Sequence, residues 1–239
     1  MAPEVTRRRF LRAAGTVAAG ATAGATITAA NAPAAATEGK RLRILGICCS
    51  PRQGKTTATA LRVCLDAAAA VDPRIEVELI ELAGKRIPGH VAADLPLEPG
   101  ERDDFPPLIP KLSDPAVVGI ILATPVYFGN MSYLCKAFLD RWVVFHTKFA
   151  LSNKLGGVIA VGGGRNCGVE LTVRSVQVAL MSQQMIVVGD APPTGHWGGT
   201  VWAGADAVKA TADLDVRRDE PGMATVKNLG RRVAEFALR

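Results

Sequence analysis

The sequence predicts an α/β fold, in which a parallel sheet is covered by helices on both faces. Short apolar runs alternate with longer segments whose apolar residues recur at helical spacing. Strands separated by helices of this length imply right-handed crossovers, which make neighbouring strands parallel. The 239 residues are 49% hydrophobic and 21% charged, which is typical of a globular chain with one sizeable core.

The first strand is predicted at Leu42–Cys48, an apolar run that leads into a turn-rich stretch. The next segment, Lys55–Val71, carries apolar residues at helical spacing and is predicted to be a helix. By the same reasoning, four further strands and three further helices are expected. The strands are Ile75–Leu82, Val117–Ala123, Gly157–Val161 and Met185–Val188, and the helices are Ser132–Phe145, Val169–Ser182 and Thr225–Leu238.

Two long segments, Gly84–Pro107 and Asp190–Pro221, fit neither pattern and are predicted to be loops. Loops of this length in a globular domain usually carry function or form an interface. In open parallel sheets the ligand binds at the carboxyl ends of the strands. The residues that directly follow the first, third and fourth strands are therefore the candidates for a functional site.

Residues 1–36 are predicted to be an export signal, and 37–239 the folded domain. Thr6–Arg12 is basic and contains paired arginines, Ala13–Ala30 is weakly apolar, and small residues follow up to Ala36. This pattern resembles a twin-arginine signal, which implies a periplasmic or other extracytoplasmic location and membrane contact only during export. A membrane anchor and a plain basic tail are the alternatives, although an Ala/Gly/Thr run gains little from lipid.

Charge and cysteine content exclude further classes. The net charge is +6, of which the first 36 residues contribute +3, and the remaining +3 is too small to argue for a nucleic-acid surface. The five cysteines include no CxxC pair and the three histidines share no ligand spacing, so neither a disulfide framework nor a zinc site is expected.

The segment after the first strand, Ser50–Thr57, has the composition of an anion site. Hydroxyls, a glycine and two cations precede a helix, whose free N–H groups and positive dipole end attract anions. A nucleotide-triphosphate P-loop is one alternative, because Gly54-Lys55-Thr56 matches its end, but Cys49 stands where that motif needs a glycine. A solvated helix start without a ligand is the other.

Two more loops are predicted at the same edge of the sheet. Thr124–Ser132 presents Tyr127 and Phe128, which suit stacking against a planar ring, although either could be a core or interface residue. Gly162–Gly168 lets the backbone approach a ligand closely, and Arg165 can balance negative charge. Three such loops together are stronger evidence for a site than any one of them.

These segments resemble the flavodoxin-like NAD(P)H-dependent FMN reductases, in the branch of the iron–sulfur flavoproteins and multimeric flavodoxin-type quinone reductases. The resemblance runs from about Leu42 to Gly189 and is most specific at Pro125–Gly129 followed by Lys136–Arg141. It implies a flavodoxin-like three-layer sandwich, a five-stranded parallel sheet of order 2-1-3-4-5, and non-covalently bound FMN. It also implies a homodimer or homotetramer, for which Trp142, Phe145, Trp197 and Trp202 are interface or core candidates.

Carried over by position, the resemblance implies three groups of FMN-binding residues. The phosphate would be surrounded by Ser50, Arg52, Lys55, Thr56 and Thr57. One side of the ring would be lined by Pro125, Val126, Tyr127, Phe128, Gly129 and Asn130, and the other by Gly163, Gly164, Arg165 and Asn166. Arg165 and Tyr127 are the candidate catalytic residues. Either Arg165 or the backbone of the glycine loop is expected to stabilise the negative charge of the reduced flavin.

The expected reaction is hydride transfer from NAD(P)H to FMN, followed by electron transfer to a quinone-like or other small acceptor. An exported electron carrier that a protein or quinol partner reduces is the main alternative, because NAD(P)H is a cytoplasmic reductant. A degenerate member of the family that binds no flavin is a third hypothesis.

The sequence departs from the iron–sulfur flavoproteins in one respect. Those proteins carry a compact cysteine cluster between the second strand and the next helix, whereas Ile87–Asp94 has no cysteine. An ordinary cluster needs four thiolates, so no metal site is expected. Cys48 and Cys49 are predicted to pack in the core, and a redox role for Cys135 or Cys167 is the less favoured reading.

Overall fold

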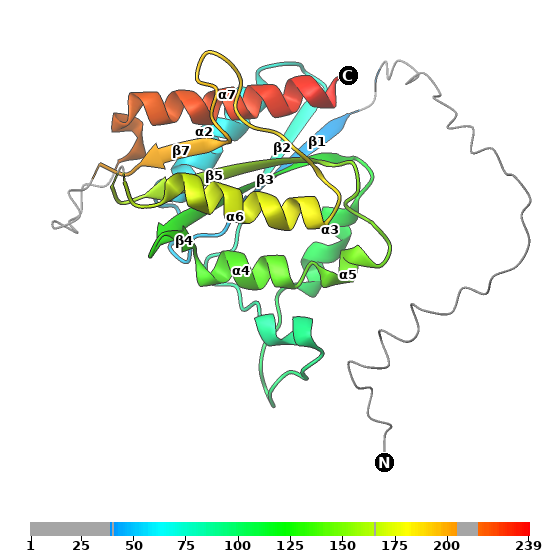
Figure 1. Ribbon diagram of the computed structural model, residues 1–239. Helices are drawn as coiled ribbons and strands as arrows, with labels where there is room; N and C mark the ends of the chain where they lie inside the picture. Colours follow the sequence, from blue (N-terminus) through cyan, green and yellow to red (C-terminus); the bar gives the residue numbers. More distant parts are fainter. Residues whose placement is uncertain (1–38, 40, 165, 205–214) are drawn as a thin grey trace, which may run out of the picture. The chain divides into compact units, whose positions relative to one another are not determined.

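A parallel sheet forms the centre of the computed structural model, which describes residues 39, 41–164, 166–204 and 215–239 (Figure 1). The main path of the sheet runs β2-β1-β3-β5-β6, which is the predicted order 2-1-3-4-5. These strands are β1 (Leu42–Cys48), β2 (Ile75–Glu81), β3 (Val117–Tyr127), β5 (Leu155–Gly162) and β6 (Ile186–Val187). The α/β, flavodoxin-like class predicted from the sequence is therefore confirmed.

The described residues form seven strands rather than the predicted five. The short β4 (Asn130–Met131) turns back antiparallel to the end of β3. The second addition, β7 (Gly199–Trp202), lies inside a segment predicted to be a loop and pairs parallel with the end of β5. Because β6 pairs with the start of β5 and β7 with its end, two short strands share one edge of the same long strand.

Helices cover both faces of the sheet, and alternate residues of each strand point to opposite layers. In β1, Ile44 packs in a cluster with α2 (Thr56–Ala69) and α7 (Glu220–Ala237). Leu45 packs instead with α4 (Tyr133–Asp140) and α6 (Val169–Ser182). Since both faces of the strand are buried, its sequence is an almost continuous apolar run rather than an alternating one.

Two predicted helices differ from the observed ones. The expected helix Ser132–Phe145 is broken at Arg141 and Trp142 into α4 and α5 (Val143–His146). The last helix begins at Glu220 rather than Thr225, because Asp219 caps it by accepting from the Gly222 N–H at 3.2 Å. A proline in the first turn is compatible with this start, since its missing N–H would have no helical partner.

The segment between β2 and α3 (Ile109–Ser113) was predicted to be a loop and contains two short 3-10 helices, η1 (Gly89–Ala93) and η2 (Pro106–Leu108). It projects from the side of the protein that carries α4 (Figure 1). A buried ion pair attaches it, in which Arg141 Nη2 donates to Asp103 Oδ2 at 2.7 Å. The Arg141 guanidinium also lies 4.8 Å from the centroid of the Phe105 ring.

The tryptophans differ in their surroundings. Trp142 and Phe145 are buried and pack edge-on against each other, which confirms that they belong to the core. Trp197 is 57% exposed, and Trp202 is half-buried at the end of β7. The predicted export signal, residues 1–36, lies outside the described residues. Within the described ranges, no helix has both the length and the apolar character needed to cross a membrane.

Candidate functional site

The loops after β1, β3 and β5 lie at one edge of the sheet, because these strands are direct neighbours. Cys48 near the end of β1 pairs with Ala123 of β3, which in turn pairs with Ile159 of β5. The carboxyl ends point to the left in Figure 1. The structure thus brings the three predicted groups of site residues to the same end of the molecule.

The loop after β1 has the features that an anion site needs. The buried Ser50 hydroxyl accepts from the Arg52 N–H at 3.1 Å and so forms the turn, while Arg52 and Lys55 are exposed. The following helix, α2, has no side-chain cap and no acidic residue in its first turn. The N-terminal N–H groups of α2 therefore remain available to a ligand.

A buried orphan hydroxyl supports this assignment. Thr57 in the first turn of α2 is 1% exposed, and its Oγ1 has no hydrogen-bond partner. Such an atom normally has a partner, so its isolation fits a site whose ligand supplies one. The sequence reasoning missed Glu81, whose Oε2 accepts from the Gly54 N–H at 2.8 Å and shapes the same loop.

The loop after β3 is a tight hairpin. The strand continues to Tyr127, so Pro125 and Val126 belong to β3 rather than to the predicted loop, and Pro125 pairs with β5. Phe128 and Gly129 form the turn, and both have positive φ, 51° and 76°. The Phe128 side chain is fully exposed, Tyr127 is 40% exposed, and Asn130 closes the hairpin opposite Tyr127. Two aromatic rings are thus presented to solvent beside the anion site.

The loop after β5 approaches the hairpin closely through its backbone at Gly168. A Cβ on Gly168, whose φ is +89°, would lie 2.9 Å from Gly129 Cα, so a larger residue would push the two loops apart. A Cβ on Gly163 or Gly164 would meet nothing within 4 Å, which leaves open space beside them. Asn166 is exposed. Arg165, the candidate catalytic cation, lies outside the described residues.

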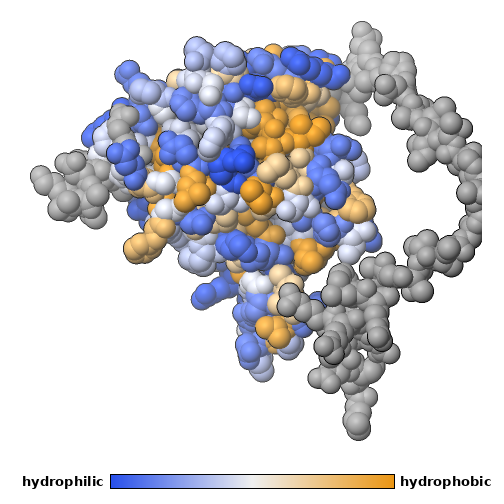
Figure 2. Space-filling view, viewed as in Figure 1, coloured by the Kyte–Doolittle hydropathy of each residue, from blue (hydrophilic) through white to orange (hydrophobic). Residues whose placement is uncertain are grey.

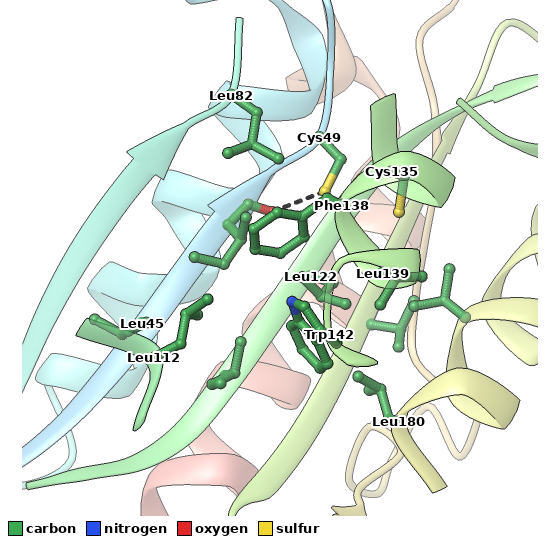
Figure 3. Packing of buried hydrophobic residues seen from close by; sticks show 14 of the residues in the cluster. Leu45, Cys49, Leu82, Leu112, Leu122, Cys135, Phe138, Leu139, Trp142 and Leu180 are labelled. Carbon is green, nitrogen blue, oxygen red and sulfur yellow. Dashed lines mark hydrogen bonds between the residues drawn. The ribbon is translucent and has the colours of Figure 1, made fainter. Parts of the chain in front are cut away.

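Beneath the loops lies a buried apolar cluster in which Cys49 and Cys135 lie close to Phe138 and Leu82 (Figure 3). Burial raises the pKa of the Cys48 thiol to about 11 and that of Cys49 well above its usual range. Both therefore stay neutral at physiological pH and pack as apolar groups, as predicted. Among the described residues, no three His, Cys, Asp or Glu side chains are grouped to hold a metal ion.

Comparison with known proteins identifies the family of the chain. The family model described as NADPH-dependent FMN reductase matches residues 42–198, more than half of the chain. The chain belongs to the NADPH-dependent FMN reductase family. It is thus an FMN-dependent oxidoreductase, and the hydroxyls, helix N-terminus and glycines described above are consistent with a flavin mononucleotide as its cofactor.

Relatives of this FMN reductase include iron–sulfur flavoproteins. One from Methanocaldococcus jannaschii is 37% identical over 197 residues, covering 81% of this chain and 96% of its own length. Another from Methanosarcina thermophila is 31% identical over 198 residues, covering 81% of this chain and 94% of its own length. A solved structure of an NADH:FMN oxidoreductase in its apo form is 20% identical with a TM-score of 0.57, covering 82% of this chain and 89% of that one. This last likeness concerns the fold.

Proposed function

We propose that this FMN reductase takes a hydride from NADPH or NADH and passes electrons to a quinone-like or other small acceptor. The observation that carries the proposal is the buried, partnerless Thr57 hydroxyl at the uncapped start of α2. Together with Ser50, Arg52, Lys55 and Thr56, it would bind the FMN phosphate. Bound FMN supplies the redox chemistry, accepting a hydride and releasing electrons one or two at a time.

The remaining site residues would position the ring. The hairpin residues Tyr127 and Phe128, with their exposed rings, would lie along one side, and the open backbone of Gly163 and Gly164 along the other. Arg165 would balance the negative charge that reduction adds. Tyr127, at the end of β3, would contact the ring edge. None of these residues needs to act as an acid or base for hydride transfer.

The acceptor is inferred from the shape of this edge. Exposed aromatic side chains next to an open glycine backbone suit a flat, conjugated molecule that can stack on the ring system. A quinone satisfies this requirement, and so do other small planar acceptors.

An exported electron carrier remains a second candidate function, and the basic, paired-arginine stretch Thr6–Arg12 supports it. Outside the cytoplasm NAD(P)H is scarce, so a protein or quinol partner would then reduce the flavin. Export itself, with a periplasmic or other extracytoplasmic location, is part of the proposal. Cell fractionation would test export by comparing the full chain with an Arg7→Lys, Arg8→Lys double variant. We expect the double variant to be retained in the cytoplasm and the unaltered chain to be exported.

An anaerobic spectrum of the purified full chain separates the two functions. Prompt bleaching of flavin absorbance by NADPH or NADH, followed by reoxidation with a quinone, is expected for the reductase. Bleaching by dithionite alone would favour the carrier. A protein that is colourless and also fails to take up added FMN would overturn both.

The proposed assembly is a homodimer or homotetramer. Apolar side chains lie among polar ones on the face that carries α6 (Figure 2), where Leu171, Val178 and Met181 are each about half exposed. Light scattering of the purified protein should give a multiple of the chain mass. Val178→Lys should shift the mass toward that of one chain if α6 forms the contact.

A further inference from the structure

We propose that Trp202 is a positioning residue, which holds the Gly163–Gly164 peptide of the flavin loop in one orientation. This inference rests on the flavin placement proposed above. Trp202 is the last residue of β7, and its indole Nε1 donates to the Gly163 carbonyl at 2.9 Å. The two residues are 39 positions apart, and the bond joins the glycine loop to a strand that was not expected from the sequence.

The hydrogen bond fixes more than one atom, because the peptide unit is planar. In a trans peptide, the carbonyl of one residue and the N–H of the next point in opposite directions. With the Gly163 carbonyl held toward the indole, the Gly164 N–H is directed away from it. Two consecutive glycines would otherwise allow this peptide to rotate easily, since neither has a side chain to restrict φ and ψ.

The indole can hold the loop because rigid elements hold Trp202. Its backbone N–H donates to Asp219 Oδ2 at 2.8 Å, and the other oxygen of this buried carboxylate caps α7. The next residue, Ala203, donates to the Gly162 carbonyl at 2.8 Å and keeps β7 beside β5 up to the loop. The orientation of a flexible glycine pair is thereby set by a helix and two strands.

A fixed N–H beside the flavin has a chemical consequence. Reduction adds negative charge to the ring system, and a donor that is already oriented stabilises that charge without reorganisation. The oxidised ring carries less charge and gains less from the same donor. The bond from Trp202 to Gly163 should therefore tighten FMN binding and, more specifically, raise the midpoint potential of the bound flavin.

Trp202→Phe tests this role, because it keeps an aromatic ring and removes the donor. We expect about fivefold weaker FMN binding, in line with the loss of one neutral hydrogen bond. We also expect a more negative midpoint potential, which a merely structural role would not produce. Trp197→Phe is the matched control, since Trp197 is exposed and should change neither value. A Trp202→Phe protein with the wild-type affinity and potential would overturn the proposal.

A second variant tests the flavin placement separately. The φ of Gly163 lies outside the left-handed region and a Cβ would project into open space, so Gly163→Val should fold and obstruct the flavin. If Gly163→Val abolishes FMN binding while Trp202→Phe changes nothing, only the role of Trp202 is wrong. If Gly163→Val binds FMN normally, the placement is wrong and the role of Trp202 is overturned with it.

If Trp202→Phe does not fold, the proposal can be tested on the wild-type protein by measuring the hydrogen-exchange rates of its indole N–H groups. The Trp202 indole should exchange more slowly than that of the exposed Trp197, and addition of FMN should slow it further. Equal exchange rates for the two indoles would overturn the proposal.

Discussion

The Ser132 hydroxyl donates a hydrogen bond to the Cys49 carbonyl at 2.7 Å, across 83 positions of the sequence. The same oxygen accepts from the Cys135 N–H at 3.1 Å and caps α4, while the Ser132 N–H donates to the Thr124 hydroxyl at 3.1 Å. One buried side chain thus ties the end of β1 to the hairpin that follows β3. The anion site and the aromatic rings are held in one arrangement by this bond.

Ser132→Ala should lower the free energy of unfolding by about 2 kcal/mol, because it removes a helix cap and leaves a buried carbonyl without a partner. Urea unfolding of the FMN-free protein would measure the loss. Ser175→Ala is the control, since that hydroxyl only donates to the Leu171 carbonyl on the exposed face of α6. Equal, small losses in both variants would contradict the bridging role of Ser132.

Thr57→Val should separate ligand binding from stability. The hydroxyl has no partner within the protein, so replacing it with a methyl group of similar size should leave the FMN-free protein as stable or more stable. FMN affinity should fall about tenfold, because a hydrogen bond to a charged phosphate is lost. Isothermal titration and thermal unfolding give the two values.

Thr59→Val, two residues further along α2, is the control for Thr57→Val. Its hydroxyl bonds to the Lys55 carbonyl within the helix, so its loss should not affect FMN affinity. Unchanged FMN binding in Thr57→Val would show that the phosphate lies elsewhere.

Phe128→Asn should stabilise the protein and impair the enzyme. Both turn positions of the hairpin have positive φ, which costs asparagine less energy than a bulky aromatic residue. We expect a gain of about 1 kcal/mol in the free energy of unfolding, with a higher KM for the acceptor because the exposed ring is gone.

Phe149 provides the matched comparison, since its φ is also positive, at 50°, and its side chain is 54% exposed. Phe149→Asn should gain similar stability without changing KM. If both variants have the wild-type KM, Phe128 does not contact the acceptor.

Alkaline pH should destabilise the protein through its buried thiols. Burial raises the pKa of Cys48 to about 11, from 9.0 for an exposed thiol, and raises the pKa values of Cys49 and Cys64 as well. A raised pKa in the folded state means that the thiols contribute their full stability below pH 9. That contribution is lost as pH rises from 9 toward 11, because the unfolded chain ionises first.

The free energy of unfolding should fall by about 1.4 kcal/mol per pH unit for each such thiol above pH 9. Cys48→Ala should reduce this slope by the contribution of one thiol. This holds whether or not the substitution also changes the free energy of unfolding at neutral pH. Urea unfolding at several pH values between 7 and 11 would measure both slopes. The same slope in both proteins would show that Cys48 ionises in the folded state as it does in the unfolded one.

The strands were predictable because buried strands such as β1 and β3 are largely apolar runs. Their order in the sheet was implied by the resemblance to the flavodoxin-like FMN reductases. The start of α7 was placed too late because the preceding loop was extended to Pro221, whereas Asp219 caps a helix that begins at Glu220. The strand β7 was missed because its four residues, Gly199–Trp202, are too few to show a period.

The position of the three candidate loops at one sheet edge was predictable for a different reason. Hydroxyls, glycines and aromatics placed directly after strands identify the three loops, and the sheet topology then brings them together. The bonds that hold the loops were not predictable, because Ser132 to Cys49 and Trp202 to Gly163 join residues that are distant in sequence. Such contacts depend on side-chain directions that only the folded chain defines.

Because β6 and β7 pair with different ends of β5, the chain leaves the sheet edge between them. The chain between them, residues 188–198, leaves the sheet and returns, and it has its own supports. The Asn228 amide donates to Thr194 at 2.8 Å, and the buried Asp190 accepts from the Thr194 hydroxyl and the His196 N–H. These bonds anchor the excursion to α7, so a tether or an added module inserted here would have to preserve Asp190 and Thr194 to leave the sheet edge unchanged.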